Sequence, residues 1–240
     1  MSDSDAVLVP GTRDVRATLD RATASDDGSA DDATTDDHTT GEGASACVVA
    51  CPPHPQLGGA RTDRRLTATS DALADRGVDC LRFDYGDWDG GYGEREDARN
   101  ALRWAADRYD AVGVYGYSFG GAIAILAAAT VDVTVRAAAV LAPASRLDDD
   151  LDDAESRSAN RSSGRGALDA AAAVEDLPCP LQVGYGERDE VADSTPVVEA
   201  AERCQQRVLA YGSDHHFVGQ HEKVGADAAA FLATHLGVDE

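Results

Sequence analysis

The sequence predicts an α/β fold in which a mostly parallel, twisted sheet is covered by helices on both faces. The main observation is that short apolar runs typical of buried strands alternate with segments of helical periodicity from residue 46 to the C-terminal end. This alternation is typical of βαβ units, whose crossover helices cover both sides of a parallel sheet. The length of 240 residues is suited to one compact core, so we expect a single domain over residues 1–240.

The predicted elements follow in chain order. Residues 6–9 and 15–19 form two short strands joined by the turn PGTRD, an N-terminal antiparallel hairpin. The later strands are expected at 46–51, 78–83, 111–115, 136–141, 180–185 and 206–211. The helices are expected at about 62–76, 95–108, 119–129, 195–203 and 220–236.

Two acidic segments interrupt the pattern, at about 22–44 and about 145–165. The first is rich in Asp, Thr, Gly and Ser and has no large apolar residue, and the second is rich in Asp, Ser and Arg, so they cannot offset the entropy of ordering. We expect flexible insertions. The second follows a strand, where it could act as a lid or be an acidic loop without a functional role.

The composition excludes several classes of partner. The chain has 44 acidic and 21 basic residues, a net charge of −23, with Lys223 as its one lysine. Such a surface repels nucleic acid and anionic membranes. The longest apolar stretch, 122–129, is too short to span a bilayer, and the acidic N-terminus differs from a secretory signal, so we expect a cytoplasmic protein. The acid-rich, lysine-poor composition resembles that of proteins from salt-in halophiles.

The cysteines do not indicate a metal site. Five are present, mostly within apolar runs such as ACVVAC and VDCLRF, and none completes a Cys/His pattern with the spacing of a zinc site. Small core residues are the favoured interpretation. We expect neither a metal nor a cofactor.

The segment VGVYGYSFGG, residues 112–121, contains the pattern G-x-S-x-G around Ser118. It directly follows a predicted strand and precedes a small-residue helix, the setting in which a nucleophilic serine sits on a strained turn at the carboxyl edge of a sheet. Gly116 and Gly120 allow strand and helix to cross closely. A capping serine in an ordinary strand-to-helix turn is the alternative.

A serine nucleophile needs a base, and the base an orienting acid. Acids follow the predicted strand 180–185 in the segment ERDEVAD, and two adjacent histidines follow strand 206–211 in SDHHF. The candidate acids are Glu187, Asp189, Glu190 and Asp193. The candidate bases are His215 and His216, of which we prefer His215.

The oxyanion of an acyl-transfer reaction needs fixed N–H donors. The N–H of Phe119, directly after the serine, is one candidate. The loop CPPHPQLGG after strand 46–51 offers another at Gln56, because Pro55 has no N–H. His54 is interpreted as a residue that shapes this loop.

The segments CPPHPQLGGARTD, LRFDYGDWDGGYGEREDARNALRW, VYGYSFGGAIA, GERDEV and GSDHHFVGQ together resemble the serine-dependent α/β-hydrolase superfamily, over nearly the whole chain apart from the acidic segments. The resemblance is greatest to its small, lid-poor, dienelactone-hydrolase-like branch. It implies an α/β-hydrolase fold with Asp189 as the acid and His215 as the base. True dienelactone hydrolases use cysteine where this chain has Ser118, so their substrate is not carried over, and Pro52 stands where the branch often has histidine.

The resemblance implies a serine hydrolase that cleaves a small carboxylic ester or thioester through an acyl-enzyme. Tyr85, Trp88, Tyr92 and Tyr117 are candidate pocket walls, although aromatic residues in such loops are as often packing residues. A peptidase of the same fold and a catalytically silent binding module are the alternatives. The expected partner is a small ester-like molecule, and the sequence indicates no oligomeric state.

The charge balance predicts that salt stabilises this protein. Because the Debye length is about 3 Å at 1 M salt, repulsion among the carboxylates is screened there and strong in dilute buffer. We expect the melting temperature, measured by calorimetry, to rise steeply from dilute buffer to molar KCl. A melting temperature independent of KCl would contradict this prediction.

Overall fold

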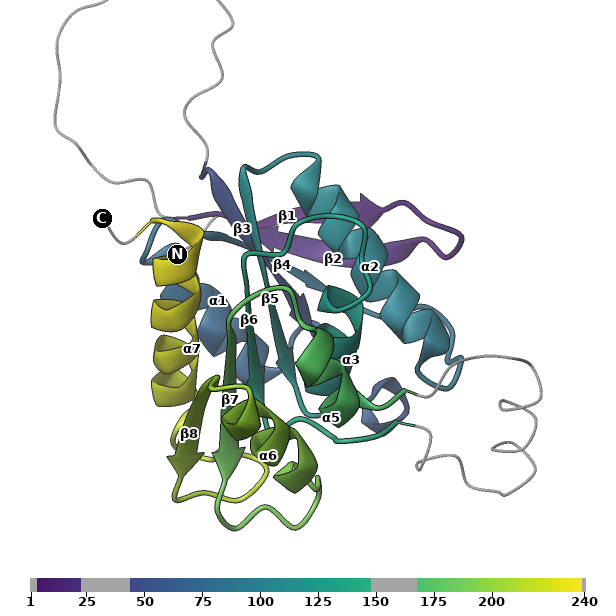
Figure 1. The fold of residues 1–240 in the computed structure, drawn as a ribbon. Coiled ribbons are helices and arrows are strands. Elements are labelled where there is room, and N and C mark those ends of the chain that lie inside the picture. The colour runs from purple at the N-terminus through teal and green to yellow at the C-terminus, as the bar shows by residue number, and fades with distance from the viewer. Residues whose placement is uncertain (1–3, 23–43, 148–167, 239–240) are drawn as a thin grey trace, which may run out of the picture.

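The computed structural model describes residues 4–22, 44–147 and 168–238 (Figure 1). Its strands are β1 (Ser4–Val9), β2 (Val15–Asp20), β3 (Ala46–Cys51), β4 (Asp79–Phe83), β5 (Ala111–Tyr117), β6 (Ala137–Leu141), β7 (Leu181–Gly186) and β8 (Arg207–Tyr211). The α-helices are α1 (Arg64–Ala74), α2 (Tyr92–Ala106), α3 (Phe119–Ala128), α5 (Ala170–Ala173), α6 (Thr195–Arg203) and α7 (His221–Leu236). Two short 3₁₀ helices are η1 (Pro55–Leu57) and η2 (Val174–Asp176).

The strands form one eight-stranded sheet in the order β1-β2-β4-β3-β5-β6-β7-β8. β1 and β2 form the N-terminal antiparallel hairpin, and β2 also pairs antiparallel with β4. From β4 to β8 every neighbouring pair is parallel. The predicted mostly parallel sheet and the hairpin are therefore confirmed, and the β strands predicted between residues 46 and 211 lie where they were expected.

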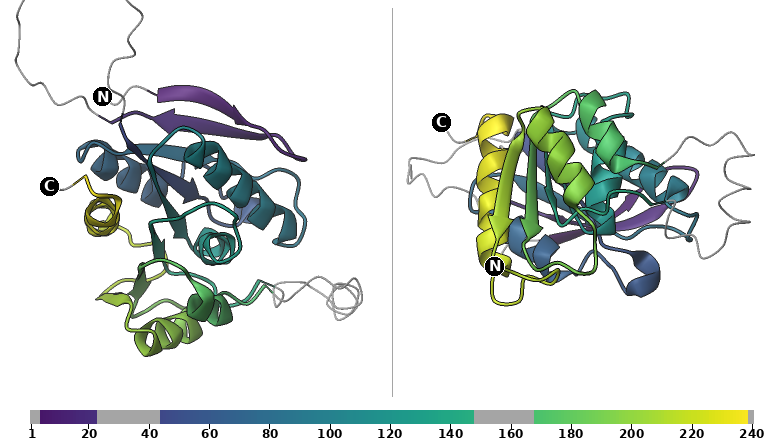
Figure 2. Two further views of the ribbon diagram at one scale, coloured as in Figure 1. Left: turned by 45° about the horizontal axis from the view of Figure 1, so that its top comes forward. Right: turned by 60° about the horizontal axis from the view of Figure 1, so that its bottom comes forward.

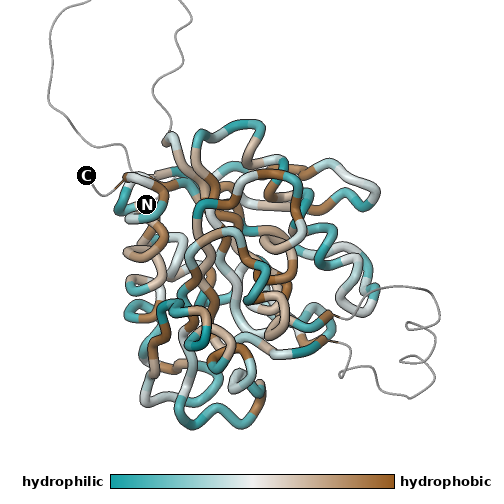
Figure 3. The backbone as a smooth tube through the Cα atoms, in the orientation of Figure 1, coloured by the Kyte–Doolittle hydropathy of each residue, from teal (hydrophilic) through white to brown (hydrophobic). Residues whose placement is uncertain are grey.

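Helices cover both faces of the sheet, as the two views in Figure 2 show. α1 and α7 lie against each other on one face, and α2, α3, α5 and α6 lie on the other. Each face encloses its own group of buried apolar side chains, one packed under α1 and α7 and the other under α2, α3 and α6. The central strands β3, β4 and β5 are buried along their whole length, as parallel strands between two helical layers must be. Figure 3 shows hydrophobic residues along this central sheet and hydrophilic residues in many of the loops.

Helix ends were less predictable than strands. α2 begins at Tyr92 rather than near 95, because the Glu94 carboxylate accepts hydrogen bonds from the N–H groups of Asp89 and Gly91 and so stabilises an earlier start. The short helices α5, η1 and η2 were not predicted. The acidic segments expected at about 22–44 and about 145–165 lie almost entirely outside the described residues, so the predictions about them stay predictions.

The parallel strands bring distant parts of the chain to one edge of the sheet. The loops 52–63, 84–91, 142–147, 187–194 and 212–220 follow the carboxyl ends of β3, β4, β6, β7 and β8, and Ser118 follows β5 directly. The arrowheads of β7 and β8 mark this edge at the bottom of Figure 1. In open α/β sheets this is the edge at which ligands bind.

A buried cluster of charges joins the hairpin turn to this edge. The Arg13 guanidinium lies 3.1 Å from a carboxylate oxygen of Asp97 and 3.7 Å from one of Glu94, and both carboxylates are inaccessible to solvent. Arg13 also donates to the backbone carbonyl of Asp87. The 84–91 loop is thereby attached to the hairpin on one side and to α2 on the other.

We expect Asp97 to make the free energy of unfolding depend on pH. Burial, assisted by the charges of Glu94 and Glu96 and opposed by the Gly86 N–H and by Arg13, raises the pKa of Asp97 from 3.8 to about 6. The folded state therefore binds this proton more tightly than the unfolded state, and the contribution of Asp97 to stability is largest below the unfolded pKa and is lost as the pH rises through about 6.

The measurement is urea unfolding of the wild-type protein and of Asp97→Asn in the same KCl concentration. Between about pH 7.5 and about pH 5, the wild type should gain roughly 1–1.5 kcal/mol of stability relative to the variant. Parallel pH profiles for the two proteins would show that Asp97 does not titrate in this range.

Candidate active site

Ser118 lies in a tight turn between β5 and α3, with φ 59° and ψ −122°. A non-glycine residue adopts this backbone conformation only where the surroundings enforce it. Here the backbone conformation of Ser118 is imposed by the close packing of α3 against β5 and against the end of β3. A Cβ atom at Gly116 would lie 2.1 Å from the carbonyl oxygen of Gly120, and one at Gly120 would lie 2.2 Å from that of Cys51. The two glycines flanking Ser118 are therefore sterically required.

The turn brings Ser118 into contact with His215, and His215 into contact with Asp189. Nε2 of His215 lies 3.0 Å from Oγ of Ser118, and Nδ1 lies 2.7 Å from Oδ2 of Asp189. The His215 and Asp189 side chains are almost completely buried. A hydroxyl, an imidazole and a carboxylate in this order can move the hydroxyl proton to the imidazole while the carboxylate stabilises the resulting cation.

The alternatives to Asp189 as the acid point elsewhere. Glu187, Glu190 and Asp193 are exposed to solvent. Oδ1 of Asp189, in contrast, accepts hydrogen bonds from the backbone N–H groups of Val191 and Ala192 at 2.9 and 3.0 Å. These bonds hold the carboxylate with its second oxygen directed at His215.

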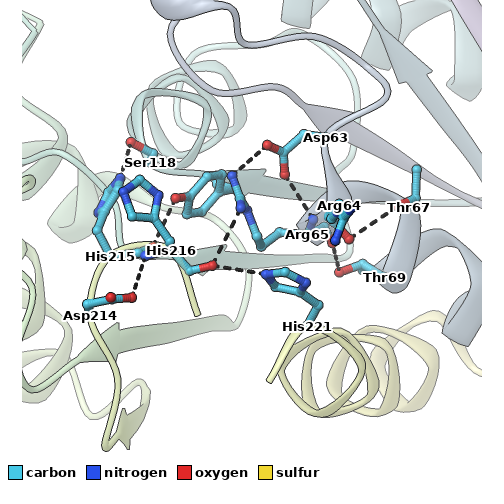
Figure 4. A network of polar contacts seen from close by, with 11 residues as sticks. Asp63, Arg64, Arg65, Thr67, Thr69, Ser118, Asp214, His215, His216 and His221 are labelled. Carbon is cyan, nitrogen blue, oxygen red and sulfur yellow. Dashed lines mark hydrogen bonds and ion pairs between the residues drawn. The ribbon is translucent and has the colours of Figure 1, made fainter. Parts of the chain in front are cut away.

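His216, the alternative base, is exposed, whereas His215 is buried. The two rings meet edge to face, with their centroids 5.6 Å apart. Because adjacent residues of the loop point in different directions, only the imidazole of His215 comes within hydrogen-bonding distance of Ser118. Figure 4 shows the contact between Ser118 and His215 as a dashed line.

The two residues predicted to donate to the oxyanion, Phe119 and Gln56, line the same cavity as Ser118. Phe119 is the first residue of α3, and the N–H groups in the first turn of a helix have no partner within the helix. Gln56 lies in η1, where its N–H donates to Nδ1 of His54 over a long 3.3 Å. The His54 ring packs against Phe119 and Trp88, with centroids 4.9 and 4.5 Å away. His54 thus shapes the loop, as expected, and also competes for the Gln56 N–H.

A cavity of about 690 Å³ opens beside Ser118. Its lining comes from the loops after β3, β6 and β7, from the start of α3 and α6, and from the segment around α5: His54, Gln56, Leu57, Ser118, Phe119, Ala144, Ser145, Arg146, Asp169, Ala171, Val191, Ala192, Asp193 and Pro196. The expected aromatic walls are absent from this lining. Tyr85, Trp88 and Tyr92 pack against the hydrophobic core, and Tyr117 is buried under α1 and α7.

Sequence reasoning missed the residues that tie the loop of Asp189 to the rest of the site. The Ser194 hydroxyl donates to the carbonyl of Pro143 at 2.9 Å, and the Ser145 hydroxyl donates to the carbonyl of Asp193. Arg146 and Asp169 form a 3.6 Å ion pair in the cavity wall. No motif marks these residues: Ser145 and Arg146 begin the second acidic segment, whose composition resembles that of a solvated loop, and Ser194 is one polar residue of the loop after β7.

The cysteines lie within the packed structure. Cys47, Cys51, Cys80 and Cys179 are buried, and all five cysteines are free. Burial raises the pKa of the Cys80 thiol to about 12, which leaves it in the unreactive protonated form. Within the described residues, no group of three or more His, Cys, Asp or Glu side chains could hold a metal ion. The helices in these residues are also too short or too polar to cross a membrane.

Comparison with known protein families shows to which family this chain belongs. A sequence model of the X-Pro dipeptidyl-peptidase (S15) family matches residues 82–231, which include Ser118, Asp189 and His215. The chain belongs to the S15 peptidase family. This S15 family member therefore belongs to the α/β-hydrolase superfamily and is a hydrolase. No curated protein sequence matches the chain.

Solved structures show the same fold at low sequence identity. An alpha-beta serine hydrolase homologue from Coxiella burnetii has 21% identity and a TM-score of 0.68, with 98% of each chain covered. Est1E from Butyrivibrio proteoclasticus has 18% identity and a TM-score of 0.73, with 97% of this S15 family member and 99% of Est1E covered. A dienelactone hydrolase from Anabaena variabilis has 19% identity and a TM-score of 0.67, with 98% and 99% covered.

The close approach of α3 to the end of β3 leads to a prediction for Gly120→Ala. The new methyl group would overlap a backbone carbonyl, which cannot move away as a flexible side chain can, so the turn that carries Ser118 must shift. We expect a loss of roughly 1–3 kcal/mol in the free energy of unfolding, measured with urea in high KCl. Gly77→Ala is the control for glycine replacement in general, because its positive φ strains the backbone but nothing lies within 4 Å of the new Cβ. Equal urea midpoints for wild type and Gly120→Ala would contradict the prediction.

Proposed function

We propose that this protein is a serine hydrolase that cleaves a small carboxylic ester or thioester through an acyl-enzyme intermediate. The observation that carries the proposal is the continuous contact from Ser118 Oγ to His215 Nε2 and from His215 Nδ1 to Asp189 Oδ2. A buried imidazole between a strained serine and a buried carboxylate has no evident use in a binding protein. In this proposal one domain, residues 1–240, carries the whole site.

The first half of the reaction forms the acyl-enzyme. His215 takes the hydroxyl proton of Ser118 as Oγ attacks the carbonyl carbon of the substrate, and Asp189 stabilises the imidazolium. The negative charge on the carbonyl oxygen is stabilised by the N–H groups of Phe119 and Gln56, each worth on the order of 3 kcal/mol. When the tetrahedral intermediate collapses, the bond to the alkoxide or thiolate breaks and the leaving group takes the proton from His215.

The second half releases the acid. His215 takes a proton from a water molecule, whose oxygen attacks the acyl carbon, and the proton then passes to Oγ as Ser118 leaves. The Gln56 N–H must turn from His54 Nδ1 to the oxyanion, and breaking the hydrogen bond to His54 costs little free energy because it is long, at 3.3 Å. None of these steps needs a metal or a cofactor.

The cavity supports a small substrate with an apolar part. Leu57 and Val191 line it and are 84% and 67% exposed, which is unusual on so acidic a surface. Ala144, Ala171 and Pro196 add further apolar lining. The lining contains the carboxylates of Asp169 and Asp193 and one guanidinium, of Arg146, so an anionic substrate would be disfavoured.

A peptidase of the same fold is the second candidate. It is supported by the match to the X-Pro dipeptidyl-peptidase family and by a puromycin-hydrolyzing peptidase from Mycobacterium tuberculosis, which has 19% identity and a TM-score of 0.66. The chain spans 40% of that peptidase, whereas it spans 99% of Est1E. Both candidates use the same residues and differ in the leaving group.

We expect Ser118→Ala to abolish hydrolysis of p-nitrophenyl acetate and butyrate in molar KCl, because the attacking oxygen is removed and the fold is not otherwise changed. The wild type should be labelled at Ser118 by a fluorophosphonate, located by mass spectrometry of the digested protein. Unlabelled, inactive wild-type protein would favour a silent binding module, and undiminished turnover by Ser118→Ala would exclude Ser118 as the nucleophile.

A substrate panel separates the two candidate functions. It compares p-nitrophenyl butyrate, a butyryl thioester and Ala-Pro-p-nitroanilide under the same conditions. Higher kcat/KM on the ester or thioester would support the first candidate, and higher kcat/KM on the anilide would support the peptidase.

A further inference from the structure

The backbone that carries His215 is held by side chains from other elements (Figure 4). The Tyr117 hydroxyl donates to the carbonyl of His215 at 2.9 Å. Arg65 donates to the next carbonyl, that of His216, over a longer 3.5 Å, and His221 contacts the same carbonyl through Nε2 at 3.0 Å. Two successive peptide groups of the 212–220 loop are thus attached to β5, α1 and α7.

Tyr117 has a particular place in this arrangement, because it is the residue directly before Ser118. Its side chain is buried, with 2% of its surface exposed, and its ring lies 5.3 Å from the imidazole of His215. The end of β5 therefore carries two neighbouring hydroxyls with different roles. The Ser118 hydroxyl needs His215 as its base, and the Tyr117 hydroxyl binds the backbone carbonyl of His215. A change at Tyr117 is therefore expected to change the distance between Ser118 Oγ and His215 Nε2.

Arg65 in turn fixes Tyr117. Its guanidinium carbon lies 4.2 Å from the centre of the tyrosine ring, within the range of a cation–π contact. Asp63, the N-cap of α1, holds the guanidinium through an ion pair of 2.6 Å and accepts a hydrogen bond from the Arg65 N–H with its other oxygen. The contacts form a chain from Asp63 through Arg65 and Tyr117 to the His215 backbone.

We propose that Tyr117, held by Arg65, is a positioning residue for His215. This inference rests on the proposed function, in which His215 is the base. Without the Tyr117 hydroxyl, the carbonyl of His215 loses its donor and the imidazole is free to move away from Ser118. Misplacement of a reacting group by about 1 Å can cost up to about 100-fold in rate, so a partial displacement predicts a loss of roughly tenfold in kcat.

The test is Tyr117→Phe, which removes only the hydroxyl. Tyr115→Phe is a matched control, because Tyr115 is buried on the same strand and the same side of the sheet, and its hydroxyl is directed at Thr69 of α1 and not at the carbonyl of His215. Measured on p-nitrophenyl butyrate in molar KCl, Tyr117→Phe should lower kcat and the rate of fluorophosphonate labelling by about tenfold and change KM by less than about twofold. Tyr115→Phe should change none of the three.

Three results would overturn the proposal. In the first, Tyr117→Phe keeps kcat within about twofold of the wild type, which is the result expected of a residue that only fills space in the core. In the second, Tyr115→Phe loses as much kcat as Tyr117→Phe, which indicates a general effect on the strand. In the third, the loss lies entirely in KM, which indicates a contact with substrate instead.

Arg65 tests the coupling between the two residues. Arg65→Met removes the charge and the fork of donors, and Arg65→Lys keeps the charge. We expect kcat to fall in Arg65→Met and to be partly restored in Arg65→Lys. The double variant Arg65→Met/Tyr117→Phe should lose little more than Tyr117→Phe alone, because both changes release the same loop. Losses that multiply would show that Arg65 acts independently of Tyr117.

An NMR measurement that does not depend on turnover tests the positioning role of Tyr117 separately from the proposed hydrolase activity. If the wild type hydrolyses no ester, the proposed function fails, and the NMR signal of the Nδ1 proton of His215 then reports on positioning alone. A signal kept in Tyr115→Phe and broadened or lost in Tyr117→Phe supports the positioning role. A signal unchanged in both variants overturns it.

Discussion

The close crossing of β5 and α3 is the constraint on which the rest of the site depends. A side chain at residue 116 of β5 would overlap the Gly120 carbonyl of α3, and a side chain at residue 120 would overlap the Cys51 carbonyl at the end of the neighbouring strand β3. This approach forces Ser118 into a strained backbone conformation with positive φ and leaves its hydroxyl at the carboxyl edge of the sheet, directly before the first N–H groups of a helix. A nucleophile and a donor for the oxyanion thus come from one local feature.

The other groups of the site depend on loops that are fastened to each other rather than to the sheet alone. The loop after β7 is held to the loop after β6 through Ser194 and Ser145. The loop after β8 is held to β5 and α1 through Tyr117 and Arg65. Each bond joins segments that are distant in sequence, so the geometry around His215 is a property of the assembled fold.

The charges of this protein fall into two groups. Most acids in the described part of the chain are exposed, and the net charge of −23 of the whole chain acts on stability through long-range repulsion that salt screens. A few are buried and paired, such as Asp20 with Arg82 at 2.6 Å and Asp97 with Arg13 at 3.1 Å. These pairs lie between the N-terminal hairpin and the parallel part of the sheet, and they hold the hairpin in register with β4 and α2 with little dependence on bulk salt.

The sequence by itself determined the strands, the order of the helices and the turn at Ser118, because each depends on local patterns of apolar residues and glycine. It also restricted the acid to the loop 187–194 and the base to His215 or His216, and the catalytic assignment stays a prediction that activity must test. Only the tertiary structure decided which side chains meet. It directed Asp189 and His215 inward and their neighbours to solvent, turned the Gln56 N–H toward His54, and buried Tyr117 beneath the histidine loop instead of in the cavity wall. The reason is that the direction of a loop side chain is set by contacts with segments far away in the chain, which local sequence patterns do not encode.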